Sequence, residues 1–163
     1  MIVVSNTSPI TNLSAIGQFD LIQKLYDTIY IAEGVWQELN ARGQSWPGSA
    51  EVERSAWVNR KKVKNQTVVA TLRGDLDPGE SETIALAIEL KADLVLMDET
   101  EGRHKAKRLG LNVTGVIGML LEAKSKGHIS EARPFLDRFC QEAGFYLSEH
   151  VYQEALRLAG EAK

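Results

Sequence analysis

Four side chains with oxygen donors occur at points where a parallel α/β sheet would bring them to one edge. Asn6 and Asp98 each follow a short apolar run that indicates a buried strand. Glu38 lies on a predicted helix after the second strand, and Glu80 lies in the first turn of a long apolar helix. Because such sheets bind ligands beyond the carboxyl ends of their strands, we expect these side chains to meet. Carboxylate and amide oxygens suit Mg²⁺ and Mn²⁺, so the sequence predicts an acidic metal pocket.

Each of these residues also has a purely structural explanation. Glu80 has the spacing from Asp77 of a helix capping box. Glu82, two positions further, points to a different face of the helix and is the alternative ligand. Glu38 on a helix is commonly solvated, and Asp98 at a strand end is able to cap the following turn. The residue types alone leave these alternatives open.

Basic residues accompany the acids at two places. Arg103 lies a short turn beyond Asp98, and Lys61 and Lys62 belong to an extended basic segment. Cationic side chains beside a metal site hold the phosphates of a nucleic acid, so these three are candidate substrate-binding residues. The structural alternative is a solvated basic face. The formal net charge of −3 means that nucleic-acid binding has to depend on such local patches or on metal ions.

The stretch LDPGESETIALAIELKADLVLMDE, residues 76–99, positions two of the four acidic-pocket residues. Asp77 followed by Pro78 predicts the start of a helix. That helix is apolar on nearly every side, which is typical of a buried helix. The apolar run at 94–97 predicts a strand covered on both faces. This helix–strand unit therefore supplies two walls of the predicted pocket.

The other elements alternate along the chain. Residues 43–48 are expected to form a loop, and Ser130 and Ser148 are expected to cap two late helices. The alternation predicts a three-layer α/β/α fold with a central parallel sheet and extra C-terminal helices. We expect one domain, residues 1–163, with an α/β core over about 1–127 and a helical extension over about 128–163. Strands are expected at 2–4, 28–31, 57–64, 94–97 and 111–114, and helices at 7–17, 19–25, 34–41, 50–55, 66–73, 78–90, 103–109, 117–127, 130–143 and 148–158.

The composition is that of a soluble globular protein, with 44% hydrophobic and 25% charged residues. The single cysteine, Cys140, excludes an internal disulfide, suits a reducing cytosol and is expected in the core. The first residues lack the features of a signal peptide, and no apolar run reaches the roughly 20 residues that span a bilayer. We therefore expect a cytoplasmic protein without membrane association.

Three stretches resemble the PIN domain family, closest to a prokaryotic PIN-like subfamily. They are VVSNTSP at 3–9, VWQEL at 35–39 and the stretch at 76–99. The later segments GRHKAKRLGLNVTGVIGMLLEAKSKGHI and FYLSEHVYQEALRLAGE are also similar, so the resemblance spans nearly the whole chain. The PIN domain is the fold of many metal-dependent ribonucleases and of toxins in prokaryotic toxin–antitoxin pairs.

The resemblance implies a set of metal-binding residues and an assisting hydroxyl. The family's first position is an Asp, which this chain replaces by an Asn. An amide oxygen still ligates Mg²⁺ but brings no charge, so metal affinity and activity should fall. The family positions fall on Asn6, Glu38, Glu80 (with Glu82 as the close alternative) and Asp98, and the hydroxyl falls on Thr7 or Ser8.

The resemblance therefore implies a Mg²⁺- or Mn²⁺-dependent endoribonuclease that hydrolyses RNA phosphodiesters through a metal-activated water. It further implies a toxin-like component with an antitoxin partner, and a homodimer. The alternative is a catalytically impaired PIN-fold interaction module that binds an antitoxin-like partner. A phospho-receiver domain ranks below both, because the first strand ends in Ser5-Asn6 without an acidic pair.

Overall fold

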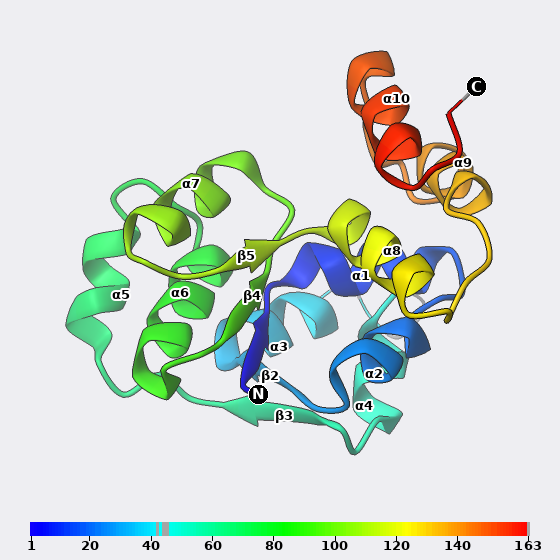
Figure 1. The fold of residues 1–163 in the computed structure, drawn as a ribbon. Helices are drawn as coiled ribbons and strands as arrows, with labels where there is room; N and C mark the ends of the chain where they lie inside the picture. The colour runs from blue at the N-terminus through cyan, green and yellow to red at the C-terminus, as the bar shows by residue number, and fades with distance from the viewer. Residues whose placement is uncertain (42, 44–45, 163) are drawn as a thin grey trace.

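The central element of the fold is a parallel sheet. The computed structural model describes residues 1–41, 43 and 46–162. Within these ranges, five strands pair in the order β3-β2-β1-β4-β5, and every neighbouring pair is parallel (Figure 1). The predicted parallel sheet is thus confirmed. The strands are β1 (Val3–Ser5), β2 (Ile29–Ala32), β3 (Val58–Lys61), β4 (Leu94–Leu96) and β5 (Val113–Thr114).

Helices cover both faces of this sheet, which gives the predicted three layers. Within the described residues, no helix combines the length and the apolar character that crossing a membrane requires. The segment at 66–73 forms a helix, as predicted. The helices are α1 (Thr7–Ala15), α2 (Asp20–Tyr26), α3 (Glu33–Ala41), α4 (Ser49–Arg54), α5 (Gln66–Leu72), α6 (Pro78–Leu90), α7 (Thr100–Arg108), α8 (Val116–Ser125), α9 (Arg133–Glu142) and α10 (Glu149–Leu158).

The alternation of strand side chains divides the apolar interior between the two faces. Val3 and Leu96 pack with residues of α1, α2 and α8. Val4 and Val95 point the other way and pack with residues of α5, α6 and α7. Helix α6 is buried along most of its length, as its apolar pattern predicts. The amino end of α6 therefore lies close to the carboxyl ends of β1 and β4.

The start of α9 differs from the prediction. Ser130 does not cap this helix, which begins at Arg133 instead. Pro134 lies in the first turn, where its fixed φ suits a helix and its missing N–H is not needed. The prediction at Ser148 is confirmed, because its side chain accepts a hydrogen bond from the backbone N–H of Val151 at 3.2 Å. In the predicted loop at 43–48, residues 44 and 45 lie outside the described part of the chain.

The prediction that Cys140 belongs to the core is wrong, because its side chain is exposed. Helix α9 buries only a narrow stripe, and Cys140 lies outside it. That stripe consists of Ala132, Leu136 and Phe139.

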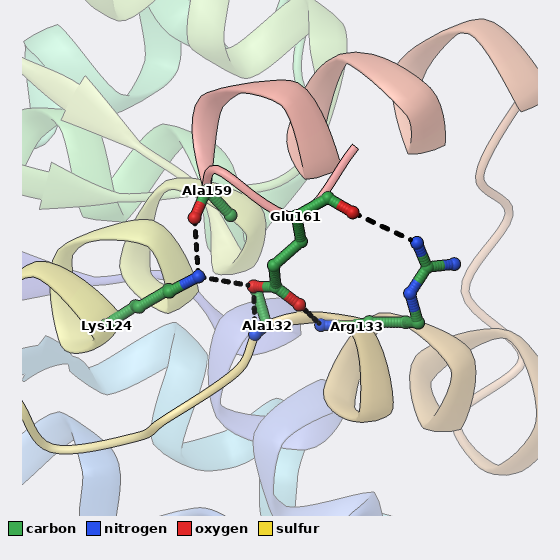
Figure 2. Close-up of polar contacts among 5 residues, drawn as sticks. All are labelled: Lys124, Ala132, Arg133, Ala159 and Glu161. Atoms are coloured by element: carbon green, nitrogen blue, oxygen red, sulfur yellow. Dashed lines mark hydrogen bonds and ion pairs between the residues drawn. The ribbon is translucent and has the colours of Figure 1, made fainter. Parts of the chain in front are cut away.

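Glu161, which follows α10, links the end of the chain to α8 and to the start of α9. Figure 2 shows its carboxylate accepting hydrogen bonds from the backbone N–H groups of Ala132 at 2.7 Å and Arg133 at 3.0 Å. Lys124 of α8 donates to the same carboxylate at 3.0 Å and to the carbonyl of Ala159. Burial alone would raise the pKa of Glu161, but these hydrogen bonds outweigh it and lower the pKa. The chain that follows α10 is thereby tied to α8 and to the start of α9.

Candidate functional site

A hollow of about 330 Å³ opens beside the carboxyl end of β1 and the amino end of α6. The first turn of α1, helix α3, the cap of α6 and the junction between β4 and α7 contribute to its wall, and Trp46 also lines it. The structure therefore brings together four of the predicted site residues, from segments far apart in the sequence. The polar side chains that line the hollow are Asn6, Thr7, Ser8, Thr11, Glu38, Asp77 and Glu99.

Asn6 lies at the centre of this arrangement and is only 3% exposed. Its backbone N–H donates to the carbonyl of Leu96 at 2.9 Å, which continues the pairing of β1 with β4. Its Nδ2 donates to Glu99 Oε1 at 3.0 Å, and its Oδ1 accepts from the hydroxyl of Thr83 at 3.3 Å. The amide is oriented by this pair of contacts, because the reversed amide would place an oxygen against the Glu99 carboxylate.

Glu99 accepts hydrogen bonds from the amide of Asn6 and the hydroxyl of Ser8, at the start of α1. The hydroxyl of Ser8 lies 2.6 Å from both carboxylate oxygens. Burial raises the pKa of Glu99, the hydrogen bond from Ser8 opposes this rise, and the neighbouring charge of Asp98 adds to it. The pKa of Glu99 is therefore above its ordinary value, which means that the charged carboxylate is less stable here than in water.

Glu38 reaches from α3 toward the start of α6. Its Oε2 accepts a hydrogen bond from the hydroxyl of Thr7 at 3.0 Å. A Cβ added to Gly79 would lie 2.5 Å from this oxygen and 3.4 Å from Asn6 Oδ1. The absence of a side chain at Gly79 therefore lets Glu38 approach the amino end of α6.

Glu80 closes the helix cap and also interacts with the other acids. Its Oε1 accepts from the backbone N–H of Asp77 at 3.1 Å, and its own N–H donates to Asp77 Oδ1 at 2.8 Å. Burial raises the pKa of Glu80, the backbone hydrogen bond of Asp77 opposes this, and the charges of Asp77, Glu99 and Glu38 raise it further. The capping box confirms the local prediction, and the electrostatic coupling makes Glu80 part of the acidic cluster.

Asp98 points away from this hollow, in contrast to the prediction that it lies beside Asn6. Its Oδ1 accepts from the backbone N–H of Val116 at 2.9 Å, and its Oδ2 accepts from Asn12 Nδ2 at 3.1 Å. The backbone at Glu99 is extended, so consecutive side chains at this junction point to opposite sides. Glu99 takes the place expected for Asp98, and metal binding by Asp98 stays a prediction.

Glu82, the alternative ligand to Glu80, fastens two helices to each other. Its Oε1 accepts a hydrogen bond from the backbone N–H of Gly34 at 3.2 Å, at the start of α3. A Cβ on Gly34 would lie 2.3 Å from Glu82 Oε2, so a glycine is needed for this approach. Glu82 is therefore engaged at α3 and Glu80 at the cap of α6, and which of the two binds a metal stays a prediction.

The predicted phosphate-binding residues lie outside the acidic hollow. Lys61 and Lys62 line a separate hollow that includes Glu89, which lies about 14 Å further along the axis of α6 than Glu80. Arg103 lines a third hollow and donates a long hydrogen bond of 3.4 Å to the carbonyl of Met97. Phosphate binding by these three residues stays a prediction. Arg103 is only four residues from Glu99 in the sequence.

The donors of the hollow suit a hard divalent cation in their chemistry. Glu38 and Glu99 line the hollow and supply carboxylate oxygens, and Asn6 supplies an amide oxygen. Glu80 is buried beside the hollow, close enough for its charge to interact with theirs. In the described part of the chain, no group of three His, Cys, Asp or Glu side chains is already arranged to hold a metal ion. Hydroxyl and amide hydrogen bonds hold the carboxylates instead. A cation therefore fits by charge and donor type, and its binding has to replace these hydrogen bonds.

Sequence reasoning noted Glu99 only as the neighbour of Asp98 and did not choose it as a site residue, although a signal for it exists. Val95 and Met97 pack on the face covered by α6. Continued alternation puts Glu99 on that same side and Asp98 on the other. Asp77 was recognised only as a cap, and its carboxylate also lines the hollow.

Comparisons with known proteins identify the family and the fold of the chain. The sequence matches a family model described as DUF3368, PIN domain, over residues 2–161. A comparison with curated proteins gives no match. Among solved structures, the chain is similar to a PilT N-terminus domain protein from the hyperthermophilic archaeon Sulfolobus solfataricus. The TM-score is 0.59 at 20% identity, and the alignment covers 76% of this chain and 93% of that chain, which supports the shared fold. Because the family model spans nearly the whole sequence, the chain belongs to the PIN domain family, whose members are typically metal-dependent nucleases.

Proposed function

We propose that this protein is an endoribonuclease that uses Mg²⁺ or Mn²⁺ to hydrolyse RNA phosphodiesters. The observation that carries the proposal is the acidic cluster in and beside the hollow. Glu80 and Glu99 both have a pKa raised by burial and by neighbouring acids, and Glu38 adds a further charge. Carboxylates with raised pKa values in a cleft are candidates for function, and a divalent cation would relieve their mutual repulsion.

In this proposal Glu38, Glu80 and Glu99 hold the cation, with the amide oxygen of Asn6 assisting. The bound ion would lower the pKa of a coordinated water and stabilise charge on the phosphate. The hydroxyls of Thr7 and Ser8 now donate to Glu38 and Glu99. When a cation takes up those carboxylates, the two hydroxyls are in position to donate to phosphate oxygens of the RNA.

The hydrogen bonds of Asn6 favour a second candidate function. Its Nδ2 and the hydroxyl of Ser8 satisfy the Glu99 carboxylate without any ion. A PIN-fold interaction module that binds a protein partner and cleaves no RNA would keep this arrangement. The two candidates differ in whether the hollow exchanges its hydrogen bonds for a cation.

The PIN resemblance extends the proposal to a toxin-like component in the cytoplasm, paired with an antitoxin protein and assembled as a homodimer. This extension depends on the resemblance and on membership of the family. Co-purification with the product of a neighbouring small gene would test the pairing, and light scattering of the purified protein would test the dimer.

The test of the proposed activity is Mn²⁺-dependent cleavage of single-stranded RNA, with EDTA as the blank. Glu99→Gln keeps the shape of the side chain and should lower the rate by more than about 100-fold, since even outer-shell partners of a metal cost 10–100-fold. Glu101→Gln is the matched control, because Glu101 is an exposed acid in the first turn of α7. Cleavage that survives Glu99→Gln would contradict the proposal, and a stable protein complex without any cleavage would favour the interaction module.

A further inference from the structure

The hollow lined by Arg103 has a volume of about 500 Å³ and lies on the other side of the junction between β4 and α7. Helix α7, the start of α8 and the segment before α10 all contribute to it. Its volume is in the range of ligand pockets. The residues that matter for its chemistry are Asp98, Arg103, His104, Lys107, Gly115 and Phe145.

The basic residues of this hollow form one face of α7. Arg103, His104 and Lys107 are spaced by one, three and four positions, which places them on neighbouring turns of the same helix side. Two cationic side chains and a histidine therefore line the hollow together with one carboxylate, that of Asp98. Lys105 belongs to another side of α7 and pairs with Asp75 at 3.4 Å. The hollow is locally basic although the whole chain is acidic.

The glycine at position 115 lets Asp98 and Arg103 pack closely against the backbone at the base of the hollow. A Cβ on Gly115 would lie 2.5 Å from Asp98 Oδ1 and 2.7 Å from an Nη atom of Arg103. The hydrogen bond from Arg103 to the Met97 carbonyl is long, at 3.4 Å, so it competes weakly with a charged oxygen. An incoming phosphate is therefore able to approach Arg103 from the hollow.

An aromatic ring completes the hollow. Phe145 is half-buried, and its ring packs against Phe139 with centroids 5.7 Å apart and a tilted geometry. A ring supported on one side and exposed toward a basic hollow is the arrangement on which bases of single-stranded nucleic acids stack.

This basic hollow adjoins the acidic one. Asp98 lines the former and Glu99 lines the latter, and the Cα atoms of adjacent residues are about 3.8 Å apart. A nucleic-acid strand that crosses the junction between β4 and α7 therefore contacts both hollows within a few nucleotides, since one strand advances about 3.4 Å per nucleotide.

We propose that the basic hollow binds single-stranded RNA next to the phosphate that is cleaved in the acidic hollow. Arg103 and Lys107 contact backbone phosphates, His104 donates to the backbone, and Phe145 stacks on a base. This inference rests on the proposed ribonuclease function and adds the path of the substrate.

The experiment measures RNA binding in EDTA, where no cleavage occurs. A fluorescently labelled single-stranded RNA is titrated with the full chain at several salt concentrations between about 50 and 200 mM. Lys107→Ala should reduce the salt slope by about 0.7, the contribution of one phosphate contact on a single strand. Arg108→Ala is the matched control, because Arg108 is an exposed cation at the next position of the same helix. It should leave the slope unchanged.

A second variant separates stacking from charge. Phe145→Leu keeps an apolar side chain against Phe139 and should weaken binding by about fivefold or more at every salt concentration, with the slope unchanged. Equal effects of Lys107→Ala and Arg108→Ala would overturn the proposal. So would poly-glutamate that displaces the RNA as well as unlabelled RNA does, since the hollow would then be a site for an acidic peptide.

The outcomes for the two proposals are distinguishable. A protein that binds RNA through Lys107 in EDTA but never cleaves it would refute the nuclease and leave the RNA path standing. A protein whose cleavage requires Glu99 while Lys107→Ala changes neither RNA affinity nor its salt slope would refute the path alone.

Discussion

Replacing Asn6 by Asp restores the first acid of the PIN family and tests whether a cation offsets the repulsion between carboxylates in the hollow. The substitution changes the 3.0 Å hydrogen bond from Nδ2 to Glu99 into a contact between two carboxylates. Two like charges 3 Å apart repel by about 5.5 kcal/mol at an effective dielectric constant of about 20, and by about 1.4 kcal/mol in water. Asn6 is nearly buried, but the side chains are able to relax apart. We therefore expect Asn6→Asp to lose about 3 kcal/mol of stability without metal, and Tm to fall by about 6 to 12 °C.

Mn²⁺ should reverse this loss, because the two carboxylates would then share a cation. Thermal unfolding followed by circular dichroism, in EDTA and then in Mn²⁺, measures both effects. Asn12→Asp is the matched control, since Asn12 Nδ2 donates to Asp98 Oδ2 at 3.1 Å outside the acidic hollow. Both variants should lose stability in EDTA, and only Asn6→Asp should recover with Mn²⁺. Recovery of both variants, or of neither, would refute the reasoning.

Three further predictions follow from the same contacts. The folded protein holds the protons of Glu80 and Glu99 to higher pH than the unfolded chain does. The free energy of unfolding should therefore fall as pH rises from about 4.3 through the raised pKa values of the folded protein. Urea titrations in EDTA at several pH values should show a weaker dependence of this free energy on pH for Glu99→Gln than for the wild type. Gly79→Ala should displace Glu38, whose Oε2 lies 2.5 Å from the new Cβ, and lower Mn²⁺-dependent cleavage by about 100-fold. Glu161→Gln should lower the free energy of unfolding by about 1–3 kcal/mol in urea while cleavage stays unchanged, since the residue ties down the C-terminal segment far from the acidic hollow in sequence.

The parts of the fold set by local signals could be predicted from the sequence. The capping box of Asp77 and Glu80 is an interaction over three positions, and the structure contains both of its hydrogen bonds. The apolar run at 94–97 predicts a buried strand, and β4 occupies most of it. The position of Asn6 at the end of β1 follows in the same way. Such features depend on neighbours in the chain, so a single sequence contains the required information.

The features that depend on distant contacts could not be predicted as well. Which of Asp98 and Glu99 enters the acidic hollow depends on how far the strand alternation continues past β4, and the prediction chose the wrong neighbour for Asn6. The Lys61–Lys62 pair was expected near the acids, but β3 is the edge strand, two strands from β1 at about 4.8 Å each. The contact of Glu82 with Gly34 likewise requires the packing of α6 on α3.

The most direct test of the central claim is Mn²⁺ binding measured by titration calorimetry on the wild-type chain and on two variants of adjacent residues. If Glu38, Glu80 and Glu99 hold the cation, Mn²⁺ binds the wild type, Glu99→Gln abolishes binding and Asp98→Asn retains it. Binding that survives Glu99→Gln but is lost in Asp98→Asn would contradict the arrangement described here, and so would the absence of Mn²⁺ binding to the wild type.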